Sequence, residues 1–332
     1  MFEDIGWKSS GSRIVREMAL VLFLVLYFFL TITTQSLGEN IHNEFQGIYL
    51  TLHHVHGFNS STPLFDLLAH DQVQVQAIEY RLTSITISKS SVSSEYSFEP
   101  RRTNRDRQDN QGLFGKFTKL MGMARNKHSM FYQLSSKYGM SMFSYCLPTS
   151  TSTGTFTIRP SASKAYVFTP MITGPRDPSL YFLRLTGITV DSIPLKVSPL
   201  LYKTPTIIDS GTIITRLPVK VYESLQEAFV KNMMSKRYKQ APSYSILNTC
   251  FKANGKSMTI PEVSIIFSGG ARLKLGTDNI VIQVEDDIKC LAFASNGATN
   301  GISIIGNRQQ ESSAVVYNIT NSRIGFASRG CN

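Results

Sequence analysis

Apolar residues recur at helical spacing in two separate segments of the chain. The first segment runs from Pro63 to Leu82, and the second runs from Val219 to about Met234. The apolar positions are Leu64, Leu67, Leu68, Val75, Ile78 and Leu82 in the first, and Tyr222, Leu225, Phe229 and Met233 in the second. Residues three, four or seven apart share one face of a helix, so each segment is predicted to be a helix that buries one side. The Ser-rich stretch Ser84–Ser97 is predicted to be a loop.

Most of the remaining chain shows short apolar runs separated by Gly, Pro, Ser and Asn, which is typical of β-strands. Strands are predicted at 206–208, at Ser313–Asn318 and at Arg323–Ala327. The 332 residues include 14 Tyr and 20 Phe, and 42% of them are hydrophobic. This composition favours a mostly β globular protein and excludes disorder over the whole chain. At about 100–200 residues per domain, the length allows two domains.

The longest apolar run, residues 18–30, follows the basic residues Lys8, Arg13 and Arg16. A basic flank before about 13–15 apolar residues is typical of a signal peptide, whereas a transmembrane helix needs about 20. We therefore expect a signal peptide with cleavage around Thr33–Gly38, and a signal anchor is the alternative. The chain is expected to enter the secretory pathway and to reach the cell wall, the extracellular space or the vacuole. Stable membrane insertion is expected only if this segment is retained.

The net charge of +11 is concentrated in one part of the chain. Residues 101–137 hold nine Lys or Arg against two Asp, a net charge of +7, which leaves +4 for the rest. No nucleic-acid-binding motif accompanies this cluster, so a solvated basic stretch is favoured over nucleic-acid binding.

The chain contains His and Cys, two residue types that often bind metals. His53, His54 and His56 lie close together, but neighbouring residues of a strand point to opposite faces, and no Asp, Glu or Cys lies nearby. No metal or other cofactor is expected. The four cysteines form no Cys-x-x-Cys motif, and their even number fits two disulfides in a secreted protein. They are Cys146, Cys250, Cys290 and Cys331. Two sequons, at Asn59 and Asn318, are candidate glycosylation sites.

The sharpest chemical signal is the motif Asp209-Ser210-Gly211-Thr212, which follows the apolar run 206–208. A buried strand delivers the carboxylate at its end, and Gly211 permits a tight turn. Ser210 and Thr212 can hydrogen-bond the carboxylate and fix its orientation. The tripeptide alone is also compatible with an ordinary turn after a strand, so the surrounding sequence must distinguish a catalytic loop from such a turn.

That context resembles the pepsin-like aspartic peptidases, and among them the plant nepenthesin-like branch. The apolar-apolar-Gly element Ile304-Ile305-Gly306 near the C-terminus is part of the similarity, which covers about residues 110–332. The other similar stretches are Asn110–Gly115, Tyr138-Gly139, Phe143–Pro148, Tyr181-Phe182, Leu185–Ile188, Ile207–Pro218, Asn248–Cys250, Ile260-Pro261, Phe267–Gly270, Cys290–Phe293, Gly325–Ala327 and Gly330-Cys331.

The resemblance implies a mostly β, bilobal acid-protease fold in which each lobe contributes one Asp-Thr/Ser-Gly loop backed by an apolar-apolar-Gly element. Asp209 would be the catalytic carboxylate of the second lobe, and Ile304, Ile305 and Gly306 would back its loop. The resemblance also implies the disulfides Cys250–Cys290 and Cys146–Cys331. The His-rich stretch and the helix after it resemble a propeptide.

The sequence contains no second Asp-Thr-Gly or Asp-Ser-Gly. Leu120, Met121 and Gly122 would be the backing element of a first lobe whose own Asp loop is missing, a piece of on the order of a hundred residues. The predicted organisation is a signal peptide (1–36), a propeptide-like and junction segment (37–109), a remnant of the first lobe (110–149) and a C-terminal lobe (150–332). The truncated first lobe is expected to be unstable, because strands that should pair across the lobes are left open.

Peptide hydrolysis by this chemistry needs two carboxylates, one to deprotonate a water and one to protonate the substrate oxygen. Four interpretations therefore stay open. The chain is a non-catalytic family member, such as an inhibitor-like binder, or an active endopeptidase that lacks its first-lobe segment here. It is alternatively a homodimer with one Asp209 from each copy, or a basic protein that binds acidic polysaccharide or membrane. The non-catalytic family member is the favoured interpretation. We expect it to be a monomer that binds a polypeptide substrate or an inhibitor-type protein partner and no nucleic acid.

Overall fold

β-strands dominate the structure, as the composition predicted. The computed structural model describes residues 48–53, 63–87, 123–149, 151–158, 165–174, 177–253, 257–298, 301–328 and 331, all within the unit Ile48–Asn332. Predictions for the signal segment (18–30), for Leu120–Gly122 and for the sequon at Asn59 lie outside the described residues. None of the described helices is both long and apolar enough to cross a membrane.

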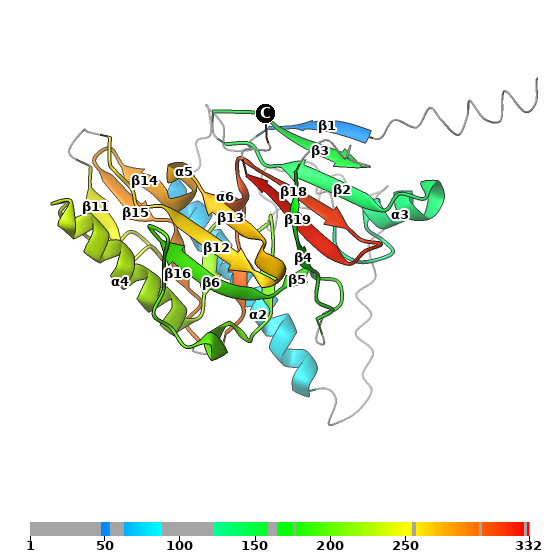
Figure 1. Cartoon of the computed structure of the whole chain (residues 1–332), viewed down its shortest axis with the longest axis horizontal. Coiled ribbons are helices and arrows are strands. Elements are labelled where there is room, and N and C mark those ends of the chain that lie inside the picture. Colours follow the sequence, from blue (N-terminus) through cyan, green and yellow to red (C-terminus); the bar gives the residue numbers. More distant parts are fainter. Residues whose placement is uncertain are drawn as a thin grey trace, which may run out of the picture. The chain divides into compact units, whose positions relative to one another are not determined.

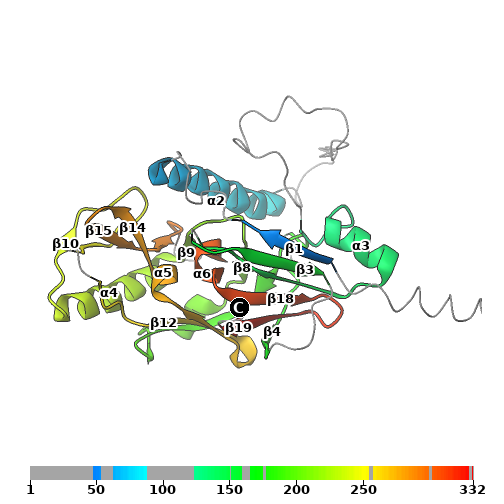
Figure 2. The same ribbon diagram turned by 90° about the horizontal axis from the view of Figure 1, so that it is seen from above.

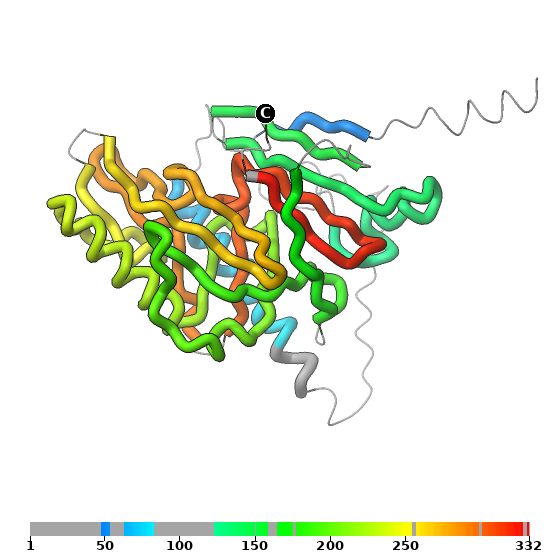
Figure 3. Tube along the Cα trace, viewed as in Figure 1, coloured from blue at the N-terminus to red at the C-terminus, as the bar shows by residue number. Residues whose placement is uncertain are grey.

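A six-stranded antiparallel sheet joins segments that are far apart in the sequence (Figures 1 and 3). Its strands are, in spatial order, β1 (Ile48–Leu52), β3 (Gly154–Ile158), β2 (Met142–Cys146), β18 (Ser313–Asn318), β19 (Arg323–Ser328) and β4 (Val167–Pro170). Figure 3 shows β1, in blue, beside β3 in green, with β18 and β19 in red. β1 comes from the segment that the sequence predicts to be propeptide-like, and it pairs with β3 along its whole length. This edge of β3 is therefore covered by β1.

Three smaller sheets make up the rest of the strand structure in the described residues. One contains β10 (Gln240–Ala241), β11 (Cys250–Lys252), β15 (Ile288–Leu291) and β14 (Val281–Glu285). The next contains β13 (Arg272–Leu275), β12 (Val263–Phe267), β6 (Leu185–Val190) and β7 (Ile193–Pro194). The last contains β16 (Phe293–Ser295), β9 (Thr215–Leu217), β17 (Ser303–Ile305), β8 (Thr206–Ile208) and β5 (Phe182–Leu183).

Both predicted helices are present. α4 (Val219–Ser235) buries the predicted face and packs against β16, β6 and β9 (Figure 1). α2 (Leu64–Ile87) begins directly after Pro63 and extends beyond Leu82, so the loop predicted from Ser84 begins no earlier than residue 88. In the part of the chain that the structure describes, the other helices are α3 (Met130–Tyr138), α5 (Thr277–Ile280), α6 (Asn307–Gln310) and the 3₁₀ turns η1 (Pro199–Tyr202) and η2 (Ser268–Gly270).

One large apolar cluster connects the six-stranded sheet with the β12 sheet. Phe143 on β2 stacks on Tyr317 of β18 with ring centroids 4.4 Å apart, and Phe267 at the end of β12 stacks on Phe326 of β19 at 5.0 Å. All four rings are buried. The predicted boundary between residues 149 and 150 falls inside this packed region, because β2 precedes it and its neighbour β3 follows it.

The structure contains both expected disulfides. Cys250 on β11 is bonded to Cys290 on β15, which is its partner in the strand register. Cys146 at the end of β2 is bonded to Cys331 near the C-terminus. The second bond ties the last residues of the chain to the six-stranded sheet.

Candidate functional site

The loop after β8 holds the Asp209 carboxylate in a fixed orientation. The Gly211 amide donates to Oδ1 at 3.0 Å, and the Thr212 hydroxyl donates to Oδ2 at 2.7 Å. Thr212 is buried, whereas Ser210 and Gly211 are exposed and Asp209 is half-buried. Each carboxylate oxygen therefore has its own donor while the group stays partly open to solvent, which is the state a reactive carboxylate requires.

The element Ile304-Ile305-Gly306 lies directly behind this loop. β17 runs parallel to β8, with Ile304 opposite Ile207 and Ile305 opposite Ile208. The Asp209 amide donates to the Ile305 carbonyl at 3.1 Å. A Cβ on Gly306 would lie 2.7 Å from the Ile213 carbonyl oxygen, so the close approach of the two backbones requires a glycine here.

α6 joins the two elements through three buried or partly buried side chains. The Gln309 side-chain oxygen accepts from the amide (3.1 Å) and the hydroxyl (2.6 Å) of Thr215. The Gln310 amide donates to the carbonyl of Ile305 at 2.8 Å, and Asn307 donates to the carbonyl of Ser210 at 3.1 Å. α6 therefore ties together the Asp209 loop at Ser210, strand β9 at Thr215 and the backing element at Ile305.

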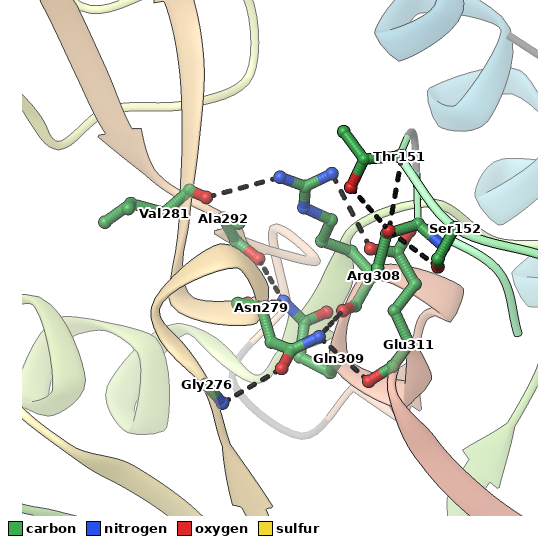
Figure 4. Close-up of polar contacts among 10 residues, drawn as sticks. Thr151, Ser152, Gly276, Asn279, Val281, Ala292, Arg308, Gln309 and Glu311 are labelled. Carbon is green, nitrogen blue, oxygen red and sulfur yellow. Dashed lines mark hydrogen bonds and ion pairs between the residues drawn. The ribbon is translucent and has the colours of Figure 1, made fainter. Parts of the chain in front are cut away.

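A second polar cluster anchors α6 to α5 (Figure 4). The Asn279 side-chain amide donates to the carbonyls of Arg308 (2.7 Å) and Glu311 (3.1 Å). Gln309 donates in turn to the carbonyls of Asn279 (2.7 Å) and Ala292 (2.8 Å). Sequence reasoning missed this cluster, because the two adjacent glutamines carry no apolar periodicity and their burial depends on strands distant in the sequence.

α2 contacts the chain directly after the Asp209 loop. The Asp71 carboxylate accepts from the amides of Ile213 (2.6 Å) and Ile214 (3.4 Å) and from Nη2 of Arg216 (2.7 Å). Both charged side chains are 0% exposed. Sequence reasoning also missed this pair, although Asp71 falls on the apolar stripe of the predicted helix, where a carboxylate needs a buried partner.

Burial and pairing act in opposite directions on these groups. Burial raises the pKa of Asp71, while Arg216 and the two amides lower it, and the nearby Asp209 charge raises it further. Burial lowers the pKa of Arg216, while the charges of Asp71 and Glu79 raise it. Both acids that act on Arg216 in this way belong to α2.

The predicted site residues fall into three groups. Asp209, Ser210, Gly211 and Thr212 are brought together with Ile304, Ile305 and Gly306, as the resemblance implied for their positions. Leu120, Met121 and Gly122 lie outside the described residues. Asn318 is only 5% exposed, and its side-chain oxygen accepts from the Asn321 amide at 3.0 Å, so a glycan there would require this turn to open. The described residues contain no group of three or more His, Cys, Asp or Glu that could hold a metal ion.

Comparison with known proteins gives consistent results. The family profile described as "Xylanase inhibitor C-terminal" matches residues 180–328. An aspartyl protease family protein of Arabidopsis thaliana is 42% identical over 228 residues, which are 68% of this chain and 48% of the relative. The aspartic proteinase nepenthesin-2 of Nepenthes gracilis is 33% identical over 238 residues, 68% of this chain and 52% of the relative. The chain thus spans about half the length of the curated relatives it matches.

Solved structures show the same fold. The crystal structure of edgp matches with a TM-score of 0.57 at 20% identity, covering 63% of this chain and 59% of that one. Basic 7S globulin from soybean matches with a TM-score of 0.53 at 21% identity, covering 63% of this chain and 57% of that one.

Proposed function

Because the chain belongs to the pepsin-like aspartic protease family, we propose that it is a non-catalytic member of this family that acts by binding a polypeptide. The observation that carries the proposal is that the sequence has one Asp-Thr/Ser-Gly motif and no second one. Asp209 in this motif has the loop geometry of a catalytic group. Two close carboxylates share one proton, so that one acts as base and the other as acid. Asp209 alone cannot fill both roles in one step.

Asp71 does not supply the second carboxylate. It lies near enough to Asp209 for the two charges to interact, but its oxygens are held by Arg216 and two backbone amides. Its side chain is 0% exposed and three of its acceptor positions are occupied by these donors, so neither water nor a substrate can reach it. Its buried pairing therefore supports a structural role.

The proposal also covers where the protein works, its oligomeric state and its partner. We propose that the protein works as a monomer in the secretory pathway, at the cell wall, in the extracellular space or in the vacuole, where disulfides persist. Its proposed partner is a polypeptide substrate or an inhibitor-type protein partner, with no nucleic acid involved.

The test is a proteolysis assay between pH 3 and 6 with an unfolded protein substrate, comparing the wild-type chain with Asp209→Asn. Both proteins should release peptides only at the rate of the buffer blank. Release by the wild type that disappears in Asp209→Asn would overturn the proposal, because it would show that Asp209 works with a second acid.

A second candidate is an active acid endopeptidase whose first lobe is supplied by a longer form of the chain. The fully built Asp209 loop and the greater length of the relatives favour it. Sequencing of the transcript across the codons for residues 101–110 tests it. An insert that encodes an Asp-Thr/Ser-Gly loop would support the endopeptidase, and an uninterrupted junction would exclude it.

A further inference from the structure

α2 covers the segment that carries the candidate catalytic carboxylate. Figure 2 shows the helix along the side of the molecule that contains β8 and β9. Asp71 contacts the backbone at Ile213 and Ile214, directly after the Asp209 loop. Gln74, one turn further on, lies so close to Gly211 that a Cβ there would be 2.8 Å from its side-chain nitrogen. The helix therefore occupies space next to the carboxylate that a bound polypeptide would otherwise enter.

The pocket that receives Asp71 is a carboxylate-binding site. Its three partners, the amides of Ile213 and Ile214 and the guanidinium of Arg216, are all donors. Three donors around one group favour an ionised carboxylate over any neutral side chain. Nε and Nη1 of Arg216 are buried without hydrogen-bond partners among the described residues, so Asp71 is the main compensation of this cation.

The rest of the contact is an apolar stripe. Leu68 packs in a cluster with Ile214, while Val75, Ile78 and Leu82 pack with residues of the sheet behind the loop. These sheet residues are Phe182, Ile207 and Ile304. Within residues 64–82 of α2, the buried positions are 68, 71, 75, 78 and 82, which lie on one face of a helix. The opposite face is exposed at Val73 and Tyr80.

We propose that residues 206–217 and β17 form a binding site for an amphipathic helix that carries a carboxylate within its apolar stripe, and that α2 is a displaceable occupant of this site. The proposal rests on the proposed function, since it names the chemistry of the polypeptide that the protein binds. α2 is joined to the rest of the unit through residues before and after it, so it competes at an effective concentration on the order of millimolar. A partner helix gains access when α2 leaves, and the ionised carboxylate in the stripe is what the Arg216 pocket selects.

Fluorescent peptides of residues 63–87 test the site in the full chain. The wild-type peptide should bind the Asp71→Asn chain at least about 10-fold more tightly than it binds the wild-type chain, because the weakened helix competes less well. An Asp71→Asn peptide should bind the same chain at least about 10-fold more weakly than the wild-type peptide. An Asp66→Asn peptide is the matched control, because Asp66 is exposed on the same helix, and it should bind like wild type. Absence of binding to the folded Asp71→Asn chain, or equal binding of all three peptides, would overturn the proposal.

Hydrogen exchange of the wild-type chain keeps the proposal testable if the Asp71→Asn chain does not fold. The amides of Ile213 and Ile214 donate to Asp71, so they are exposed when α2 leaves. They should exchange together with the amides of α2 and at least about 10-fold faster than those of β18. Exchange of all these amides only at the rate of global unfolding would show that α2 is an integral part of the fold. Neither test measures proteolysis. If both fail, the proposal about α2 is wrong, and the proteolysis assay with Asp209→Asn still tests the proposed function independently.

Discussion

The segment from Asp209 to Leu217 is flanked by two ion pairs that differ in burial and in construction, since Arg308 in the second pair is 19% exposed. On the α2 side, Asp71 and Arg216 are 2.7 Å apart, fully buried, and the carboxylate also accepts from two amides. On the α6 side, Arg308 and Glu311 are 3.7 Å apart, and Oε2 of Glu311 is buried without a hydrogen-bond partner in the described residues. Burial raises the pKa of Glu311 to about 7, against the weaker opposing effect of Arg308.

In both pairs burial raises the pKa of the carboxyl group, but the forces that oppose it differ: at Asp71 these are the close charge of Arg216 and two backbone amides, and at Glu311 only the more distant charge of Arg308. Two short donor contacts, of 2.6 and 2.7 Å, and a longer one of 3.4 Å replace the water that Asp71 loses. Glu311 has a more distant partner and loses its water with little replacement. The α2 side of the segment is therefore held by charge, and the α6 side is held by amide hydrogen bonds and backbone packing.

The largest effect is expected from Arg216→Met, which leaves Asp71 buried with two amides only. Removal of one member of a buried pair typically lowers the free energy of unfolding by about 3–5 kcal/mol. Urea unfolding measures the loss. The double variant Asp71→Asn/Arg216→Met keeps an acceptor for the Ile213 amide and should lose about 2 kcal/mol less than the sum of the single variants. Additive losses would show that the two side chains do not act as a pair.

The α6 side can be perturbed without a change of charge by Gly306→Ala. The added Cβ would lie 2.7 Å from a backbone oxygen, and backbone shifts are costly, so we expect a loss of about 3 kcal/mol in urea unfolding. Gly187→Ala is the matched control, because its nearest neighbour would be a flexible Ile266 carbon at 4.0 Å. Equal losses in the two variants would contradict the close backbone contact behind the Asp209 loop.

Glu311→Gln sharpens the comparison through its pH dependence. Because burial raises the pKa of Glu311 from 4.5 to about 7, the folded protein binds the extra proton between these values. The stability that this bound proton contributes is fully present below about pH 4.5, and it is lost as the pH rises through about 7. Relative to wild type, the variant should gain on the order of 2 kcal/mol between pH 4.5 and 8, measured by urea unfolding. Parallel pH curves for the two proteins would contradict a neutral Glu311.

The smallest effect is expected from Glu223→Gln on α4, which serves as an exposed reference for the two ion pairs beside the Asp209 segment. Lys220 and Glu223 are 3.1 Å apart, but their side chains are 59% and 52% exposed. Water and salt screen such a pair, so its loss should change the free energy of unfolding by less than about 0.5 kcal/mol. A loss as large as that of Arg216→Met would mean that burial does not distinguish these pairs.

Local patterns predicted much of the fold correctly. The helix predicted from Val219 to about Met234 ends one residue later, and Ser313–Asn318 is a strand with the predicted bounds. Asp209 and Gly306 lie in one site, as the resemblance implied. These features depend on side-chain periodicity and on short motifs, which act over a few residues.

The placement of α2 could not be predicted from the same patterns. The helix was expected, but the sequence places Asp71 and Arg216 145 positions apart, and nothing local to either residue identifies the other. The role of β1 was missed for a similar reason, because strand pairing depends on an available edge and not on the strand alone. The predicted boundary after residue 149 was drawn from motifs, whereas β2 and β3 are hydrogen-bonded neighbours across it.

The sequence by itself determined the helical faces, the main strands, the Asp209 loop chemistry and the absence of a second motif of that kind in these residues. Only the tertiary structure decided that a helix from the N-terminal third covers this loop and that its carboxylate compensates a buried arginine. The physical reason is that burial and charge pairing depend on which surfaces meet in three dimensions. Periodicity specifies that α2 must bury one face, and the packed fold specifies which residues that face contacts.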